Sequence, residues 1–137
     1  MGTFKVALAD DHPVLREVVR KVLSDSNDIE VIADVGDGVA LLHLLDRLQV
    51  LPDMVILDVA MPRLAGPEVA RYIRKLFPRI KILMFTMHAE DEYVSQAFRA
   101  GANGYLLKDE NPAELFTAIY AIRGGHTYRS PLLESGN

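Results

Sequence analysis

The stretch Met54-Val55-Ile56-Leu57-Asp58 consists of four consecutive apolar residues followed by an acid. A strand that is apolar at every position is typical of a parallel sheet covered on both faces. In an open parallel sheet the ligand crevice lies outside the carboxyl ends of the strands. The stretch therefore predicts a buried strand that delivers Asp58 to a crevice.

Three further apolar runs end in a polar or charged residue. These runs and the residues that follow them are residues 6–9 with Asp10 and Asp11, residues 82–85 with Thr86, and residues 105–107 with Lys108. One strand end with an acid would mean little. Four strand ends that carry two acids, one acid, a hydroxyl and an ammonium indicate a site for a divalent cation and a phosphoryl group.

Strand-like and helix-like patterns alternate along the chain. We expect strands over residues 5–9, 30–35, 54–57, 81–85 and 104–107, each followed by a helix of about a dozen residues. Repeated βα units with right-handed crossovers predict a three-layer α/β/α sandwich with a five-stranded parallel sheet and five helices. Periodicity alone leaves the order of the strands open.

Composition narrows the class of protein. A chain of 137 residues, half of them hydrophobic, fits one globular domain, and its net charge of −4 argues against non-specific nucleic-acid binding. The chain has no cysteine, which excludes disulfides and a thiol nucleophile and fits a cytoplasmic protein. We find no signal segment or apolar run long enough to span a membrane, and so expect no membrane association.

The acids at the strand ends point to magnesium. Asp10, Asp11 and Asp58 would repel one another without a cation, and oxygen ligands suit Mg²⁺. Taken singly, the Asp pair could cap a helix, Thr86 could be an ordinary strand residue and Lys108 a surface lysine. Together they are the parts that hold a phosphoryl group in transfer, and an aspartate can itself be the nucleophile.

The chain resembles the receiver domain of bacterial two-component response regulators over about residues 4–131. The motifs that carry the resemblance are Asp10-Asp11, Asp58-Val59-Ala60-Met61-Pro62 with Gly66, Thr86, Gly101-Ala102 with Gly104-Tyr105, and Lys108-Asp109. The resemblance implies a flavodoxin-like strand order, 2-1-3-4-5. It also implies that Asp58 is the phosphoacceptor, and that Asp10, Asp11, Asp58 and the main-chain carbonyl of Ala60 hold Mg²⁺.

The resemblance implies three further roles. Lys108 would pair with a phosphoryl oxygen, Thr86 would move its hydroxyl onto the phosphoryl group, and Tyr105 would change rotamer with it. The phosphoryl group would come from a sensor histidine kinase or a small acyl phosphate. The rotamer changes of Thr86 and Tyr105 would make these two residues the switch.

Finer motifs resemble the NarL/FixJ branch, whose receivers precede a LuxR-type helix-turn-helix. These motifs are Ala9-Asp10-Asp11-His12-Pro13 with Arg16-Glu17, residues 104–109, and Gly124-Gly125 with Tyr128-Arg129-Ser130-Pro131. We expect a receiver over residues 1–125 and a C-terminal tail or interdomain linker over 126–137. DNA would then be bound only through an output domain that this chain lacks. Phosphorylation could also produce a homodimer, for which Phe116 and Tyr120 are candidate contacts if they do not merely flank the core.

Two alternatives and one hypothesis accompany this interpretation. The chain could be a free-standing receiver that acts by protein contact, or a Mg²⁺-dependent phosphatase with an aspartate nucleophile. The phosphatase would need an aspartate two residues after Asp58, where this chain has Ala60. We further hypothesise that Ala60, Met87 and His88 alter hydrolysis of the acyl phosphate and the entry of donors.

Overall fold

The computed structural model describes residues 2–135, in which one six-stranded parallel sheet has the order β2-β1-β3-β4-β5-β6. The strands are β1 (Phe4–Ala9), β2 (Ile29–Val35), β3 (Met54–Leu57), β4 (Lys81–Thr86), β5 (Gly104–Leu107) and β6 (Tyr128–Arg129). The helices are α1 (Pro13–Leu23), α2 (Gly38–Arg47), α3 (Gly66–Leu76), α4 (Asp91–Arg99), α5 (Glu114–Arg123) and α6 (Pro131–Ser135).

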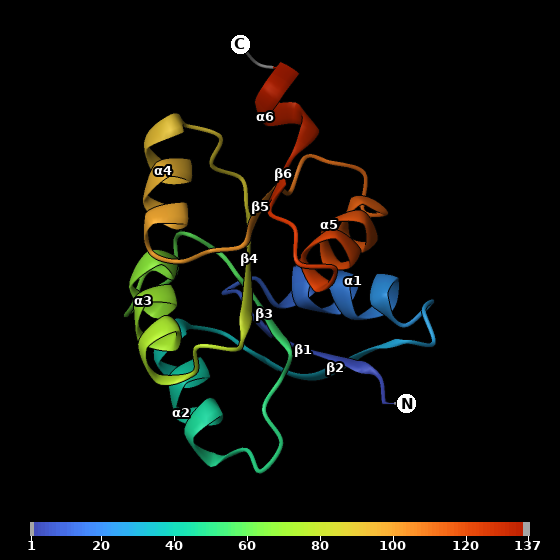
Figure 1. Ribbon diagram of the computed structural model, residues 1–137, viewed down its shortest axis with the longest axis vertical. Coiled ribbons are helices and arrows are strands. Elements are labelled where there is room, and N and C mark those ends of the chain that lie inside the picture. Colours follow the sequence, from blue (N-terminus) through green and yellow to red (C-terminus); the bar gives the residue numbers. More distant parts are fainter. Residues whose placement is uncertain (1, 136–137) are drawn as a thin grey trace.

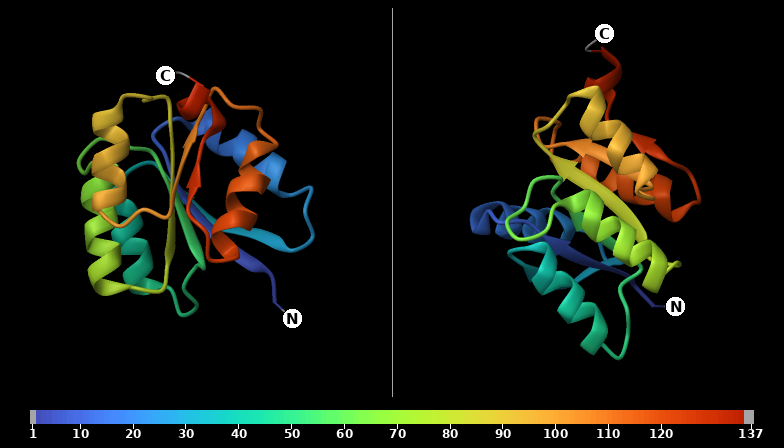
Figure 2. Two further views of the ribbon diagram at one scale, coloured as in Figure 1. Left: turned by 45° about the horizontal axis from the view of Figure 1, so that its top comes forward. Right: turned by 90° about the vertical axis from the view of Figure 1, so that its left-hand side faces the viewer.

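Helices cover both faces of the sheet and form the predicted three layers. Helices α1 and α5 lie on one face, whereas α2, α3 and α4 lie on the other (Figures 1 and 2). Successive residues of β1 alternate between the two cores: Val6 and Leu8 pack toward α1 and α5, and Ala7 and Ala9 toward the other helices. All four residues of β3 are buried, as expected for a central strand covered on both sides.

Local signals set the helix boundaries. Pro13 is the first residue of α1, where its missing N–H has no intrahelical partner. The side chain of Asp37 accepts a hydrogen bond from the Ala40 amide at 2.8 Å and caps α2. After α4 the chain turns at Gly101, whose φ of 106° is favourable only for glycine. These residues fix where α1 and α2 begin and where the chain turns after α4.

The carboxyl-terminal segment differs from the prediction of five strands and five helices. Residues 128–135 form β6 and α6, and β6 pairs with β5 in parallel. Tyr128 is only 9% exposed and Ser130 is fully buried, although their sequence shows no core-forming pattern. The Ser130 amide donates to the Tyr105 carbonyl at 2.9 Å, and its hydroxyl accepts from the Leu107 amide at 3.3 Å. Backbone pairing with β5, the buried Tyr128 side chain and the Ser130 hydroxyl therefore hold this segment on the sheet.

Among the described residues, none of the helices has the length and apolar content that crossing a bilayer would require.

Candidate functional site

The strand register brings the polar strand ends to one edge of the sheet. Leu57 pairs with Ala9 on one side and with Met84 on the other, so Asp58 and Asp10 follow neighbouring strands at the same level. On the next pair, Thr86 is aligned with Leu107, and the Lys108 amide donates to the Thr86 carbonyl at 2.8 Å. The residues that follow β1, β3, β4 and β5 thus lie at one edge of the sheet.

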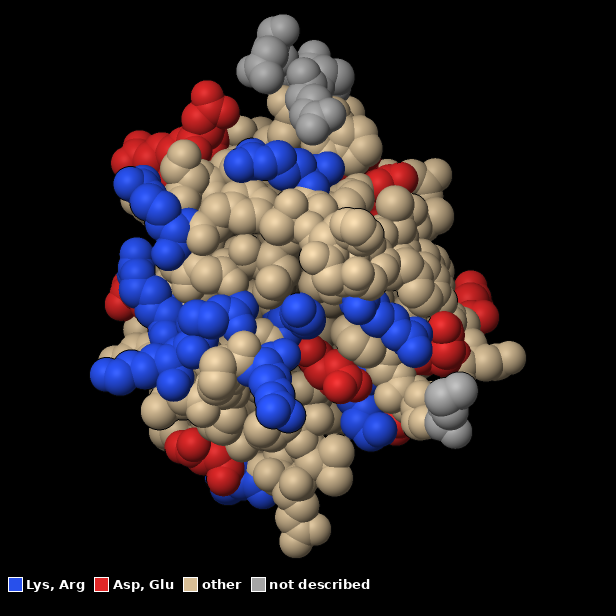
Figure 3. Space-filling model, in the orientation of Figure 1, with Lys and Arg blue, Asp and Glu red and all other residues tan. Residues whose placement is uncertain are grey.

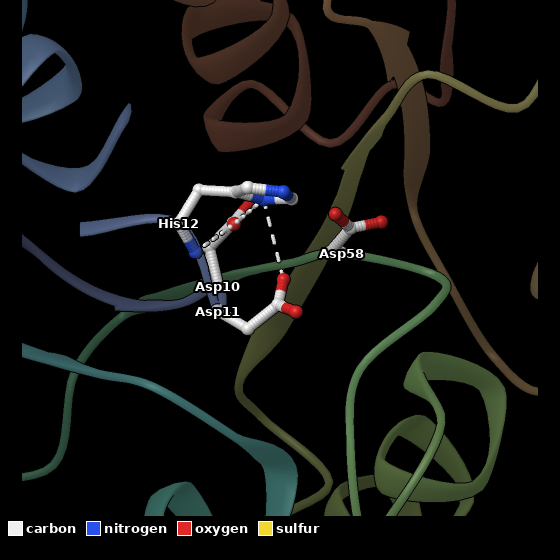
Figure 4. A group of neighbouring side chains, drawn as sticks. All are labelled: Asp10, Asp11, His12 and Asp58. Carbon is white, nitrogen blue, oxygen red and sulfur yellow. Dashed lines mark hydrogen bonds and ion pairs between the residues drawn. The ribbon is translucent and has the colours of Figure 1, made fainter. Parts of the chain in front are cut away.

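The acids form a compact group at this edge of the sheet. One ligand atom from each of Asp10, Asp11, His12 and Asp58 lies within 4.8 Å of the others. Figure 4 shows Asp10, Asp11 and His12 after β1 and Asp58 facing them from the end of β3. Asp10 and Asp58 are 1% and 5% exposed, whereas the Asp11 side chain is 39% exposed. The site therefore has a buried base and an open rim.

Lys108 joins the two buried acids. Its ammonium lies 2.8 Å from Asp10 Oδ2 and 2.7 Å from Asp58 Oδ2, and its side chain is 8% exposed. Burial lowers the pKa of Lys108, but hydrogen bonds and charge interactions with the two carboxylates outweigh burial and raise this pKa above its ordinary value. Lys108 is therefore a fixed positive charge in contact with Asp58.

Backbone contacts hold Asp58 and Asp10 in place. The Ala60 amide donates to Asp58 Oδ1 at 3.2 Å, which leaves Oδ2 for Lys108. Gly66 packs so closely on this loop that a Cβ atom there would lie 2.4 Å from the Asp58 carbonyl oxygen. On the other side Arg16 Nη1 donates to the Asp10 carbonyl at 2.5 Å. Arg16 thus supports the backbone of Asp10. The sequence showed Arg16 only as part of the NarL/FixJ motif and gave no sign of this contact.

The two expected switch residues are linked through His88 in the loop between β4 and α4. Thr86 is fully buried, and its hydroxyl accepts from the His88 amide at 3.4 Å. The buried Tyr105 donates its hydroxyl to the His88 carbonyl at 2.7 Å. Burial raises the pKa of Tyr105 far above its ordinary value, and nearby acids add to this, so the phenol stays neutral and keeps its proton. Both side chains therefore act on one loop.

His12 is the member of the group that sequence reasoning did not assign to it. Its Nδ1 atom lies 2.9 Å from Asp10 Oδ1 and 3.2 Å from Asp11 Oδ1, and its side chain is 65% exposed. The sequence shows that His12 follows the acid pair but not that its ring turns back over it. In this arrangement His12 contacts one oxygen of each of the two carboxylates as a polar neighbour.

The group fits a hard divalent cation. Octahedral Mg²⁺ places its oxygen ligands about 2.1 Å from the ion, so opposite ligands are separated by about 4.2 Å. The separation of 4.8 Å or less among atoms of Asp10, Asp11 and Asp58 is close to that span. The open rim at Asp11 leaves room for the waters that Mg²⁺ usually retains. Oxygen donors and partial exposure therefore match the chemistry of magnesium.

Comparison with known proteins decides the family. A sequence model of the response regulator receiver domain matches residues 6–120. The chain belongs to the response regulator receiver family. This receiver is 44% identical over 121 residues to YxjL of Bacillus subtilis, an uncharacterised transcriptional regulatory protein, with 88% of the chain and 55% of YxjL covered. It spans about half of the length of such curated relatives, which are transcriptional regulators.

Solved structures agree with the family. A LuxR-family response regulator from Aurantimonas sp. SI85-9A1 is 36% identical, with a TM-score of 0.90, and the match covers 98% of this receiver and 94% of that chain. RcsB from Salmonella typhimurium is 28% identical over 98% of this receiver and 65% of that chain, with a TM-score of 0.87. Another RcsB structure contains two dimers bound to two parallel DNAs. It is 26% identical with a TM-score of 0.88, and the match covers 98% of this receiver and 67% of that chain.

Proposed function

We propose that this receiver accepts a phosphoryl group on Asp58 from a sensor histidine kinase and thereby switches a DNA-binding output domain. The observation that supports this most is the contact between the Lys108 ammonium and the buried carboxylates of Asp10 and Asp58 at 2.8 and 2.7 Å. This contact joins three strand ends in one polar site. Membership of the receiver family gives the site a signalling role.

In the transfer step, a carboxylate oxygen of Asp58 attacks the phosphorus of a phosphohistidine. A new O–P bond forms, the N–P bond of the donor breaks, and the imidazole leaves with its electron pair and takes up a proton. Asp58 Oδ1 is oriented by the Ala60 amide and Oδ2 by Lys108. The ammonium is then in position to interact with the negative oxygens of the transferred group.

Mg²⁺ would be held by Asp10, Asp11, Asp58 and the main-chain carbonyl of Ala60. When bound, it would neutralise charge on the acids and on the phosphoryl oxygens. The residues of the chain keep separate tasks: Lys108 bridges the two buried acids, and Arg16 fixes the Asp10 backbone. The same site would support hydrolysis of the acyl phosphate, so the receiver assists its own phosphorylation and dephosphorylation.

The response would be carried by Thr86 and Tyr105. A phosphoryl group can shift a two-state equilibrium only if it contacts one state better than the other. Thr86 can provide that contact if its hydroxyl leaves the His88 amide for a phosphoryl oxygen. Because Tyr105 contacts the same loop through the His88 carbonyl, its side chain would respond to this movement.

The output and the partners follow from the relatives. Because the similar proteins are transcriptional regulators and RcsB occurs as DNA-bound dimers, we assign this receiver to transcriptional control in the cytoplasm. DNA would be contacted through an output domain outside this chain. A phosphorylation-dependent homodimer could use α5, where the half-exposed Tyr120 hydroxyl contacts Ser26 and Asp28 while the Phe116 ring packs against the core.

The direct test is intact-mass analysis after incubation with acetyl phosphate and Mg²⁺. We expect an adduct of one phosphoryl group on the unmodified chain and none on Asp58→Asn. Asp53→Asn is the matched control, because Asp53 is an exposed acid at the opposite end of β3. An adduct that persists on Asp58→Asn, or is lost on Asp53→Asn, would contradict the assignment.

A further inference from the structure

A hollow of about 560 Å³ lies between α3 and α4, on the side of the sheet away from α1 and α5. Its lining includes the buried Val59, which directly follows Asp58, together with Arg71, Tyr93 and Arg99. A second hollow of about 280 Å³ on the outer surface of α3 shares Arg71 and adds Lys75. Because Glu68 and Arg71 line both hollows, we consider the two together and call them the α3–α4 groove.

The α3–α4 groove carries cations without partners. Within residues 2–135, Arg71, Lys75 and Arg99 are exposed and form no ion pair or side-chain hydrogen bond, whereas Arg16 and Arg63 are paired with acids. Figure 3 shows Lys and Arg gathered over α3 on this face. Glu68 is the acid among the lining residues of both hollows, so the groove keeps a net positive charge. This charge is notable in a chain with a net charge of −4.

We propose that the α3–α4 groove binds an anion of the phosphate class that carries more than one negative charge. The lining includes one arginine from each helix, Arg71 from α3 and Arg99 from α4. Their planar guanidinium groups have the donor geometry that pairs with phosphate oxygens. The hollow of about 560 Å³ has the size of small-molecule sites. The Tyr93 ring and the Gln96 amide could add contacts to a nucleoside, so inorganic pyrophosphate and nucleoside diphosphates share the chemistry that the groove recognises.

The groove is in contact with the switch. The Tyr93 ring packs on the His88 ring with centroids 4.6 Å apart, and His88 is the residue that both Thr86 and Tyr105 hold by its backbone. A shift of this loop on phosphorylation would therefore move one wall of the groove. We therefore expect phosphorylation to change the affinity of the groove for the anion. By reciprocity, a bound anion would change the tendency of the receiver to adopt its phosphorylated state. This coupling, unlike the anion site itself, rests on the proposed function.

The anion site is tested by titrating inorganic pyrophosphate and ADP, separately and without Mg²⁺, into the unphosphorylated chain, with calorimetry and amide chemical shifts as readouts. We expect saturable binding with shifts in α3 and α4. Arg71→Gln and Arg99→Gln should each weaken binding about tenfold, which corresponds to the loss of one charge-assisted contact. Arg47→Gln changes an exposed arginine of α2 that has no ion pair within the described part of the chain, and it should leave binding unchanged.

The outcomes separate the two parts of the proposal. ADP that binds more tightly than pyrophosphate, with the gain lost in Tyr93→Leu, identifies a nucleotide, whereas equal affinities identify a free inorganic anion. No saturable binding, or equal weakening by Arg47→Gln, overturns the anion site and leaves the Asp58 assignment standing. At fixed excess Mg²⁺, beryllofluoride should change the affinity at least about threefold, and an unchanged affinity overturns the coupling alone.

Discussion

Gly66 is the residue at which a single methyl group would disturb the phosphoacceptor loop. A Cβ atom there would lie 2.4 Å from the Asp58 carbonyl oxygen and 2.9 Å from Val59 Cα, and neither backbone atom can move without shifting the site. We expect Gly66→Ala to lower the free energy of unfolding by about 1–3 kcal/mol, the usual cost of overpacking, and to slow phosphorylation. Urea denaturation and the mass assay measure the two effects.

Gly36→Ala is the matched control for Gly66, because the nearest atom to a Cβ at Gly36 is Arg16 Nη1 at an ordinary 3.6 Å. Equal stability of Gly66→Ala and the unmodified chain would show that the loop is not tightly packed there.

Met87 is an exposed residue whose side chain is expected to protect the acyl phosphate on Asp58 from hydrolysis. It follows Thr86 in sequence and is 57% exposed. If its bulk limits the access of water, Met87→Ala should shorten the lifetime of phosphorylated Asp58 by about two- to tenfold. The measurement is the dephosphorylation half-life in Mg²⁺, with the equally exposed Leu76→Ala, 57% exposed on α3, as the control. An unchanged half-life for Met87→Ala would remove Met87 from the mechanism.

At the level of single residues, the sequence indicated which acids and which lysine lie at the strand ends, because each follows an apolar run. It did not indicate the bridging position of Lys108 between Asp10 and Asp58, nor the turn of His12 back over the acid pair. Such contacts depend on side-chain rotamers and loop paths, which periodicity does not encode.

Helix α1 and strand β2 are joined by an ion-pair cluster on Asp34, which pairs with Arg16 at 2.9 Å and also with Arg20. Burial raises the pKa of Asp34, but the two arginines lower it by more, so its pKa is below the ordinary 3.8. The carboxylate therefore contributes stability above about pH 4, and this contribution is lost as the pH falls through the lowered pKa.

We expect Asp34→Asn to lower the free energy of unfolding by about 1–3 kcal/mol near neutral pH and by less in strong acid. Urea denaturation near pH 7 and near pH 3 gives both values. Asp46→Asn, at an exposed acid of α2, serves as the control and should show no such pH-dependent difference. A difference for Asp34→Asn that is independent of pH would contradict the role of its charge.

The elements themselves were largely predictable, because βα units carry both periodicities and strong boundary residues such as Pro13, Asp37 and Gly101. The exception is the segment that forms β6 and α6. A strand of two residues has no detectable alternation, and its pairing with β5 depends on backbone groups that every residue has. Where the receiver ends and a linker begins stays a prediction.

For the whole molecule, the strand order followed from family resemblance and not from periodicity, because several doubly wound orders bury the same apolar runs. The order found, with β1 and β3 adjacent and β4 and β5 beyond them, is what brings Asp10, Asp58, Thr86 and Lys108 to one edge. The site is therefore a property of the topology as much as of its residues.

The most direct measurement is a crystal structure of this receiver grown with Mg²⁺ and beryllofluoride. We predict one ion held by Asp10, Asp11, Asp58 and the main-chain carbonyl of Ala60, with Lys108 in contact with a fluoride. An ion bound elsewhere, or beryllofluoride on an acid other than Asp58, would contradict the account.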